Sequence, residues 1–288
     1  MIINRGGIMA RLMVMGTTSS AGKSLLVTGL VRYFKKNGYK SYPFKSQNMS
    51  SKCVVLADGK KISTAQALQA YSAGIEPDVR MNPVLLMPKS NTGSMVVLDG
   101  VEYKHMQARE YFQFKTELRP HIIEIFKEIE AENDIVVIEG AGSPAEINLR
   151  ENDIVNMGFA EMVDAPVILV ADIDRGGVFA SLYGTVMLLD PEERKRIKGL
   201  VINKFRGDKT LLDSGIKKIE ELTGIPVVGL IPYEHFELVD EDSLIDYDKL
   251  ANHKEQTKEE LEAELDKLEM VLENNMDMEF IKRISGIK

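Results

Sequence analysis

The chain has 288 residues, of which 44% are hydrophobic and 28% charged, a composition typical of a globular protein with one large domain and room for an appendage. Its net charge of −8, without any basic block, argues against a nucleic-acid partner, and no apolar run approaches the roughly 20 residues that cross a bilayer. The single cysteine, Cys53, excludes an intramolecular disulfide and a multi-cysteine metal site, and the first residues lack the apolar core of a signal peptide, so we expect a cytoplasmic protein without a membrane partner.

Short apolar runs along the chain predict strands, and helical patterns lie between several of them. The predicted strands are 12–16, 40–44, 84–87, 94–98, 134–139, 166–171, 198–203 and 226–231, and the predicted helices are 25–36, 106–130, 176–189 and 209–223. The run Ile135–Ile138 has no polar interruption, which indicates a parallel strand covered on both faces. The alternation predicts an α/β fold with a doubly wound, mainly parallel sheet, whose ligands bind at the carboxyl ends of the strands.

The pattern changes near the end of the last predicted strand. We expect one domain over residues 10–235, an acidic linker over 236–256 and a C-terminal helical appendage over 257–288. Within that appendage one stripe of leucines has helical spacing: Leu261, Leu265, Leu268 and Leu272. The appendage is therefore expected to pack on the body of the protein or on a partner.

The segment between the first predicted strand and the first predicted helix reads Gly-Thr-Thr-Ser-Ser-Ala-Gly-Lys-Ser, residues 16–24. Inward N–H groups and the helix N-terminus would hold a phosphate chain there, through Gly16, Thr17, Ser20, Ala21 and Gly22. Lys23 would reach the β- and γ-phosphates and Ser24 would ligate Mg²⁺, as in P-loop NTPases. The usual spacing has a glycine at position 17, one residue after the glycine of this chain.

A second group of candidates follows the strand 134–138. Glu139 would emerge at the carboxyl edge of the sheet beside the phosphate loop, where an acid can hold Mg²⁺; the alternative is a solvated glutamate that ends the strand. Gly142, shortly after it, lets backbone approach a ligand closely. By its spacing alone, Asp58 before Gly59 is more typical of a turn than of a ligand.

Two further strand ends carry polar residues with open interpretations. Asn203 follows a strand and either reads a purine or caps the next segment. Asp172 and Arg175 lie in a glycine-bearing segment after another strand, where they form either a switch-like loop or a surface ion pair.

Six segments together resemble the cobyric acid synthase family, within the dethiobiotin synthetase-like group of P-loop proteins. They are residues 16–24, 43–50 (Pro-Phe-Lys-Ser-Gln-Asn-Met-Ser), 81–86, 139–149, 172–180 (Asp-Ile-Asp-Arg-Gly-Gly-Val-Phe-Ala) and 203–208. The phosphate loop and Glu-Gly-Ala-Gly are shared with the wider group, whereas 45–50 and 172–179 are more specific.

The resemblance implies a reaction. Mg-ATP would phosphorylate a peripheral carboxylate of adenosylcobyrinic acid a,c-diamide, and ammonia would convert the acyl phosphate into a carboxamide, leading to cobyric acid. The implied cofactors are ATP and Mg²⁺. The implied catalytic residues are Lys23, Lys45 and Glu139, and the implied metal ligands are Ser24, Asp58 and Glu139. Adenine would contact Asn203, and the residues expected at the corrinoid substrate are Gln47, Asn48, Gly142, Asp172 and Arg175.

This sequence departs from the family pattern in two ways. The family usually has a lysine where this chain has Met87, and Lys89 is the nearest substitute. Full-length members also carry a C-terminal glutaminase with a nucleophilic cysteine, whereas Cys53 lies in the synthetase part. We therefore expect free ammonia, or ammonia from a separate glutaminase subunit, and no hydrolysis of glutamine. The oligomeric state, a homodimer included, stays open.

Three other interpretations remain. A relative that amidates the a and c positions of cobyrinic acid, or one that acts on the precursor of dethiobiotin, is disfavoured by the segment 45–50. A switch ATPase that binds a partner or membrane usually has an extra lysine early in the loop and a basic membrane helix, whereas this chain has Thr17-Thr18 and an acidic terminal helix. A non-catalytic corrinoid-binding or regulatory protein would differ from the enzyme in lacking corrinoid-dependent ATP turnover.

Overall fold

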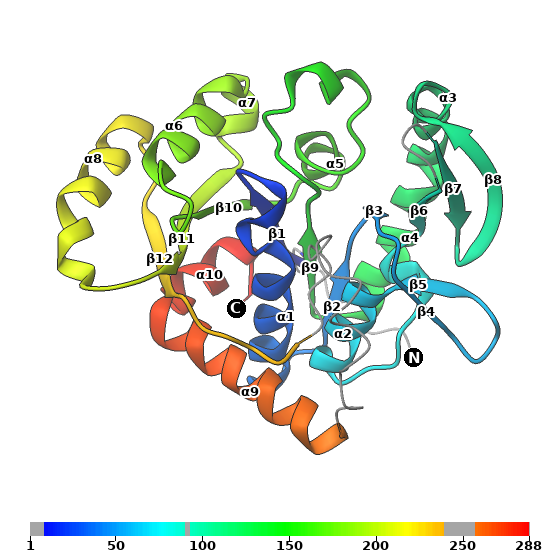
Figure 1. Ribbon diagram of the computed structural model, residues 1–288, viewed down its shortest axis with the longest axis horizontal. Coiled ribbons are helices and arrows are strands. Elements are labelled where there is room, and N and C mark those ends of the chain that lie inside the picture. The colour runs from blue at the N-terminus through cyan, green and yellow to red at the C-terminus, as the bar shows by residue number, and fades with distance from the viewer. Residues whose placement is uncertain (1–8, 90–92, 239–256, 288) are drawn as a thin grey trace.

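A computed structural model of the chain describes residues 9–89, 93–238 and 257–287. Its centre is a six-stranded sheet in the order β12-β11-β10-β1-β9-β2, in which every pair of neighbours is parallel (Figure 1). The strands are Ala10–Gly16 (β1), Ser41–Phe44 (β2), Ile135–Glu139 (β9), Val167–Asp172 (β10), Ile197–Phe205 (β11) and Val227–Pro232 (β12). The predicted α/β fold with a mainly parallel sheet is confirmed.

The residues of β1 show why the central sheet needs cover on both sides. Met13 and Met15 belong to one apolar cluster, whereas Leu12 and Val14 belong to another, and all four are fully buried. Successive side chains of a strand point to opposite faces, so each face of the sheet has a hydrophobic core of its own. Helices α1, α9 and α10 contribute to the second cluster, and α4, α5 and α6 to the first.

Ten α-helices lie in the part of the chain that the structure describes. They are Lys23–Lys36 (α1), Thr64–Ala73 (α2), Ala108–Phe114 (α3), Arg119–Glu132 (α4), Met157–Met162 (α5), Val178–Leu188 (α6), Pro191–Arg194 (α7), Asp213–Thr223 (α8), Lys258–Asn275 (α9) and Met278–Ser285 (α10). The prediction of one helix over 106–130 is wrong at its start and its middle. Residues 106–107 end a strand, and the 3-10 turn Lys115–Leu118 separates α3 from α4, whose first turn contains Pro120.

A second, four-stranded sheet in the order β3-β6-β7-β8 and a hairpin lie beside β2 in Figure 1. The sheet contains Gln47–Met49 (β3), Val84–Pro88 (β6), Gly93–Leu98 (β7) and Val101–Gln107 (β8), and the hairpin pairs Cys53–Val55 (β4) with Lys61–Ser63 (β5). The predicted strands 84–87 and 94–98 are therefore present, but they belong to this separate sheet. Its first strand, β3, follows β2 closely and starts near the edge of the central sheet where β2 ends.

The predicted C-terminal helical segment forms α9 and α10, which pack on the body of the chain. Leu268 and Leu272 contact α1 so closely that a Cβ on Gly29 would lie 2.3 Å from a methyl carbon of Leu272. Arg32 of α1 donates hydrogen bonds to Glu262 and Asp266 of α9. Most of the predicted linker, residues 239–256, lies outside the described residues, so the division of the chain near residue 235 stays a prediction.

Candidate nucleotide-binding and catalytic site

The predicted phosphate loop connects β1 to α1. After Gly16 the chain makes the short 3-10 turn Ser19–Ala21, passes through Gly22 at φ +99° and enters α1 at Lys23. A Cβ on Gly22 would also lie 2.2 Å from Nδ2 of Asn203, so both the backbone angle and the space require glycine. The resulting loop at a helix N-terminus is the arrangement that binds phosphate through backbone N–H groups.

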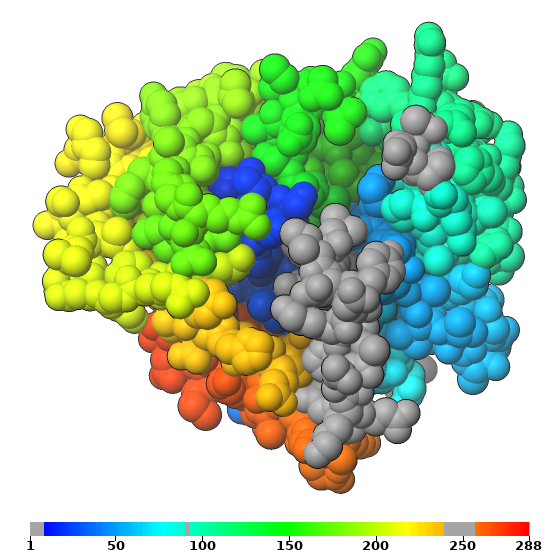
Figure 2. All heavy atoms as spheres, in the orientation of Figure 1, coloured from blue at the N-terminus to red at the C-terminus, as the bar shows by residue number. Residues whose placement is uncertain are grey.

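The ammonium of Lys23 lies inside this loop. It donates hydrogen bonds to the carbonyl oxygens of Thr18, at 2.8 Å, and Ser19, at 2.9 Å, and the side chain is buried. A cation enclosed by the loop fits a bound polyphosphate, whose oxygens are stronger acceptors than carbonyls. In Figure 2 the blue atoms of the phosphate-loop segment reach the surface between the segments that follow β9 and β10.

The end of β11 ties the phosphate loop to the sheet. Asn203 Nδ2 donates to the carbonyl of Ala21 at 3.0 Å. Its neighbour Lys204, at φ +61°, donates to the carbonyl of Ser20 and to the carboxylate of Asp172, both at 2.9 Å. The predicted contact of Asn203 with adenine stays a prediction. Sequence reasoning placed Lys204 at a strand end but gave it no role, because its role depends on contacts between strand ends.

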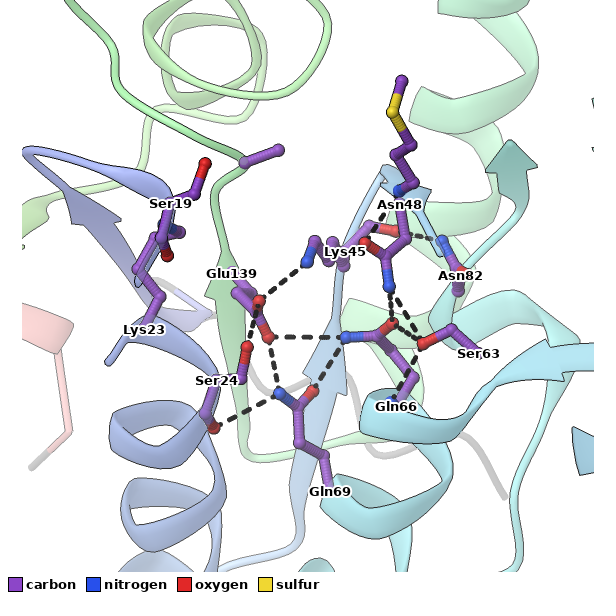
Figure 3. A network of polar contacts seen from close by, with 12 residues as sticks. Ser19, Lys23, Ser24, Lys45, Asn48, Ser63, Gln66, Gln69, Asn82 and Glu139 are labelled. Atoms are coloured by element: carbon purple, nitrogen blue, oxygen red, sulfur yellow. Dashed lines mark hydrogen bonds and ion pairs between the residues drawn. The ribbon is translucent and has the colours of Figure 1, made fainter. Parts of the chain in front are cut away.

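Glu139 is the centre of the polar network in Figure 3. Its Oε1 accepts hydrogen bonds from Ser24 Oγ at 2.8 Å and from Lys45 Nζ at 2.7 Å, and its Oε2 accepts one from Gln69 Nε2 at 2.6 Å. The side chain is only 1% exposed, so the alternative of a solvated, strand-ending glutamate is wrong. Ser24 from the first turn of α1 and Lys45 from the end of β2 therefore meet at the carboxylate that ends β9.

The surroundings of Glu139 keep it ionised. Burial alone would raise the pKa of this carboxyl, but the Lys45 ammonium and the hydrogen bonds from Lys45, Gln69 and Ser24 outweigh burial, so the pKa lies below its ordinary value. A carboxylate beside a serine hydroxyl is an oxygen donor set that suits Mg²⁺, which commonly takes one or two protein ligands together with phosphate oxygens. The residues present thus fit a magnesium nucleotide, and their metal role remains a prediction.

The predicted substrate residues of the segment 45–50 have protein partners. Asn48 Nδ2 donates to Ser63 Oγ and to Gln66 Oε1, each at 2.9 Å, and Gln47 Oε1 accepts from the Tyr111 hydroxyl at 2.6 Å. Asn48 is buried and Gln47 half-buried. This segment therefore runs from the Glu139 network towards the second sheet.

Other predicted residues lie at the margin of this site or outside it. Asp58 lies in the exposed β4–β5 turn, with its carboxylate on Lys60, and the hairpin projects away from the phosphate loop in Figure 1. The structure thus does not bring Asp58 to Ser24 and Glu139. Gly142 adopts φ +58° in the segment after β9.

Asp172 and Arg175 differ in their exposure to solvent. The carboxylate of Asp172 is buried and binds Lys204, whereas the side chain of Arg175 is 74% exposed and 3.9 Å from Asp172. Met87, at the position of the family lysine, is buried in a small apolar cluster with Leu85 and Val97. Sequence reasoning also missed Gln66 and Gln69, although their spacing of three residues on one helix was an available signal.

The fold and site define a P-loop nucleotide-binding protein, and comparison with known families agrees. The family described as the CobQ/CobB/MinD/ParA nucleotide binding domain matches residues 12–245, and the chain belongs to it. Among the residues described, no helix has both the length and the apolar composition that crossing a bilayer requires.

Two curated relatives with more than 50% sequence identity to this chain have the same name. The chain is 56% identical over 243 residues to a protein named cobyric acid synthase from Alkaliphilus metalliredigens, covering 84% of this chain and 48% of the relative. It is 59% identical over 233 residues to one of the same name from Streptococcus sanguinis, covering 81% and 47%. The chain thus spans about half the length of these relatives. The cell division protein FtsY of Thermotoga maritima, at 17% identity and a TM-score of 0.41 over 92% of this chain and 69% of that one, is too distant to carry an argument.

Proposed function

We propose that this chain catalyses the ATP-dependent amidation of corrinoid side-chain carboxylates, converting adenosylcobyrinic acid a,c-diamide to cobyric acid. One observation carries the proposal beyond family likeness. Lys45, from the segment 45–50 that is specific to the resemblance, and Ser24, from the phosphate loop, share the Oε1 atom of Glu139. Lys45, which would contact the substrate carboxylate, therefore lies next to Ser24, which would contact the magnesium nucleotide.

The proposed reaction has two steps. A carboxylate oxygen of the corrinoid attacks the γ-phosphorus of ATP, ADP leaves, and an acyl phosphate forms. The lone pair of ammonia then attacks the acyl carbon, phosphate leaves with the bonding electrons, and a proton is lost from nitrogen to give the carboxamide. Alignment and charge neutralisation do most of the work in such a transfer.

The residues present suit both steps. Lys23 and Lys45 supply positive charge on the two sides of the transferring phosphoryl group, and the loop N–H groups orient the nucleotide. Ser24 and Glu139 would hold Mg²⁺, which when bound neutralises phosphate charge. Asn48 and Gln47 would orient the substrate carboxylate, and Asn203 the adenine.

For the ammonia donor we propose free ammonia or ammonia from a separate glutaminase. A glutaminase of the family type uses a cysteine nucleophile, and the only cysteine in these 288 residues is Cys53. It lies on β4, paired with Ser63, within the synthetase part of the chain. A corrinoid and an ammonia source are thus the expected partners.

The deciding experiment is mass spectrometry of a corrinoid a,c-diamide incubated with the protein and Mg-ATP, once with ammonium chloride and once with glutamine. Product with ammonium alone, at the mass expected when a hydroxyl becomes an amino group, supports the proposal. Product with glutamine alone would overturn the assigned ammonia source. No product in either reaction, with ATP still bound, would overturn the amidase and favour a non-catalytic nucleotide- and corrinoid-binding protein.

A further inference from the structure

Three side-chain amides form a chain of hydrogen bonds that ends on Glu139 (Figure 3). Asn48 Nδ2 donates to Gln66 Oε1 at 2.9 Å, Gln66 Nε2 donates to Gln69 Oε1 at 3.4 Å, and Gln69 Nε2 donates to Glu139 Oε2 at 2.6 Å. All four side chains are at most 3% exposed. Every amide in this relay points its N–H towards the carboxylate.

That common direction follows from the chemistry of the terminal group. An ionised carboxylate only accepts hydrogen bonds, so the neighbouring amide must turn its NH₂ group towards it and its oxygen away. The next amide must then donate to that oxygen, and in a buried network such aligned bonds reinforce one another. Ser63 holds the far end, because its hydroxyl donates to Gln66 Oε1 and accepts from Asn48.

The relay also makes the two oxygens of Glu139 unequal. Oε2 is occupied by Gln69, with Gln66 Nε2 a further 3.4 Å donor, whereas Oε1 faces the hydroxyl of Ser24 and the ammonium of Lys45. The two oxygens of an unrestrained carboxylate are equivalent, and its plane rotates. Here the amides on the α2 side hold one oxygen, which fixes the plane of the carboxylate and keeps the other oxygen beside the phosphate loop.

We propose that Gln69, supported by Gln66, is a positioning residue that orients Glu139 so that Oε1 is presented, together with Ser24, to a divalent cation. Through Asn48 the relay connects this carboxylate to the strand expected to contact the substrate. The inference rests on the proposed role of Glu139 as a metal ligand. Partners that orient a ligand in this way commonly change metal affinity by about 10- to 100-fold when removed.

The test is the affinity for Mn²⁺, measured by electron paramagnetic resonance in the presence of a non-hydrolysable ATP analogue. Gln69→Met removes the N–H donor while keeping a side chain of similar length, and is expected to weaken Mn²⁺ binding by about tenfold. Gln66→Met, whose donor lies at 3.4 Å, is expected to have a smaller effect in the same direction.

Ser72→Ala is the matched control. Ser72 is on the same helix, is fully buried, and donates to the carbonyl of Thr28 on α1 at 2.8 Å, so its loss also removes a buried α1–α2 hydrogen bond. It is expected to leave Mn²⁺ affinity unchanged, and the melting temperatures of all variants show how much each change costs in stability.

Wild-type affinity in Gln69→Met, or an equal loss in Ser72→Ala, would overturn the proposal. If Gln69→Met did not fold, unchanged affinity in Gln66→Met would overturn the relay, and a reduced one would support it. The titration contains no corrinoid. A protein that failed to amidate, but whose Mn²⁺ affinity still depended on Gln69, would therefore overturn the proposed function and leave the positioning role standing.

Discussion

The ammonium of Lys45 and the carboxylate of Glu139 form a buried ion pair at 2.7 Å because their strands are in register. In the parallel pair of β2 and β9, Phe44 lies opposite Ile138, and each strand continues into its charged residue. Lys45 and Glu139 therefore leave the sheet side by side at its carboxyl edge, where parallel α/β sheets bind ligands. Two residues 94 positions apart in the chain reach the same point by strand pairing alone.

Glu139→Gln tests this centre. The substitution keeps the shape of the side chain but removes the charge, so Ser24 loses its anionic partner. The proposed magnesium site also loses its anionic ligand. We expect the Mg²⁺ concentration for half-maximal ATP turnover to rise by about 10- to 100-fold, measured by phosphate release across a magnesium titration.

Asp58→Asn, measured in the same magnesium titration, tests whether Asp58 is a metal ligand. Because Asp58 lies in an exposed turn, the geometry predicts an unchanged magnesium dependence, whereas the family resemblance predicts a loss.

Unchanged magnesium dependence in Glu139→Gln would remove Glu139 from the metal site.

Lys23→Ala tests the phosphate loop. We propose that the ammonium enclosed by the loop neutralises the β- and γ-phosphates, so its loss removes charge stabilisation from the transferring phosphoryl group. We expect ATP turnover to fall by at least about 100-fold, measured as corrinoid-dependent phosphate release. Lys217→Ala, an exposed lysine on α8, is the control and should retain wild-type turnover. Full activity in Lys23→Ala would show that this loop does not bind the reacting nucleotide.

The fold and the loop were accessible to sequence reasoning because both are encoded in consecutive residues. Every predicted strand is present, since each contains a short apolar run, as in residues 135–138 of β9. The phosphate loop is likewise one contiguous segment between a strand and a helix. The strands β3, β4 and β5 have three residues each, and β8 is exposed over most of its length, so none has an apolar run long enough to reveal it.

The rest of the site depends on contacts that no local pattern contains. Gln66 and Gln69 are polar residues in a helix of mostly small side chains, and only the packing of α2 against α1 and β2 brings them to Glu139. Lys204, near the end of β11, likewise reaches the carboxylate of Asp172 at the end of β10 only in the folded sheet. Asp58 shows the converse case, because a role taken from the resemblance was assigned to a residue that the fold leaves in an exposed turn.

Lys204→Met tests the link between β11 and the phosphate loop. The ammonium holds the carbonyl of Ser20 and the carboxylate of Asp172, and hydrogen bonds to charged groups contribute about 1.5–3 kcal/mol. We expect nucleotide affinity to fall by roughly tenfold, since about 1.4 kcal/mol corresponds to a factor of ten. Titration with a fluorescent ATP analogue measures this effect.

Lys204→Gly distinguishes the loss of the side-chain hydrogen bonds from the effect of backbone strain at position 204. Glycine adopts φ +61° without strain, so this variant loses the same hydrogen bonds but keeps the native turn more readily. Equal losses of affinity in both variants identify the side-chain contact as the cause. If the glycine variant bound nucleotide like the wild type, the contact with Ser20 would have no part in holding the loop.

The attachment of α9 to α1 is expected to depend on pH through Asp266. Partial burial alone would raise the pKa of this carboxyl, but the hydrogen bond and charge of Arg32 outweigh burial, so the folded-state pKa lies below 3.8. A carboxyl whose pKa is lower in the folded state binds protons more readily when unfolded. Its contribution to stability is therefore complete above about pH 5 and is lost as the pH falls through the folded-state pKa.

Asp266→Asn removes that contribution at every pH. We expect the variant to unfold at lower urea than the wild type at neutral pH, with the difference between their midpoints narrowing as the pH is lowered below about 4. Glu273→Gln, an exposed acid on the same helix, should give no such narrowing. If the difference between the two urea midpoints did not change as the pH was lowered, the charge of Asp266 would not hold α9. The attachment of this helix would then rest on its buried leucines, Leu265, Leu268 and Leu272.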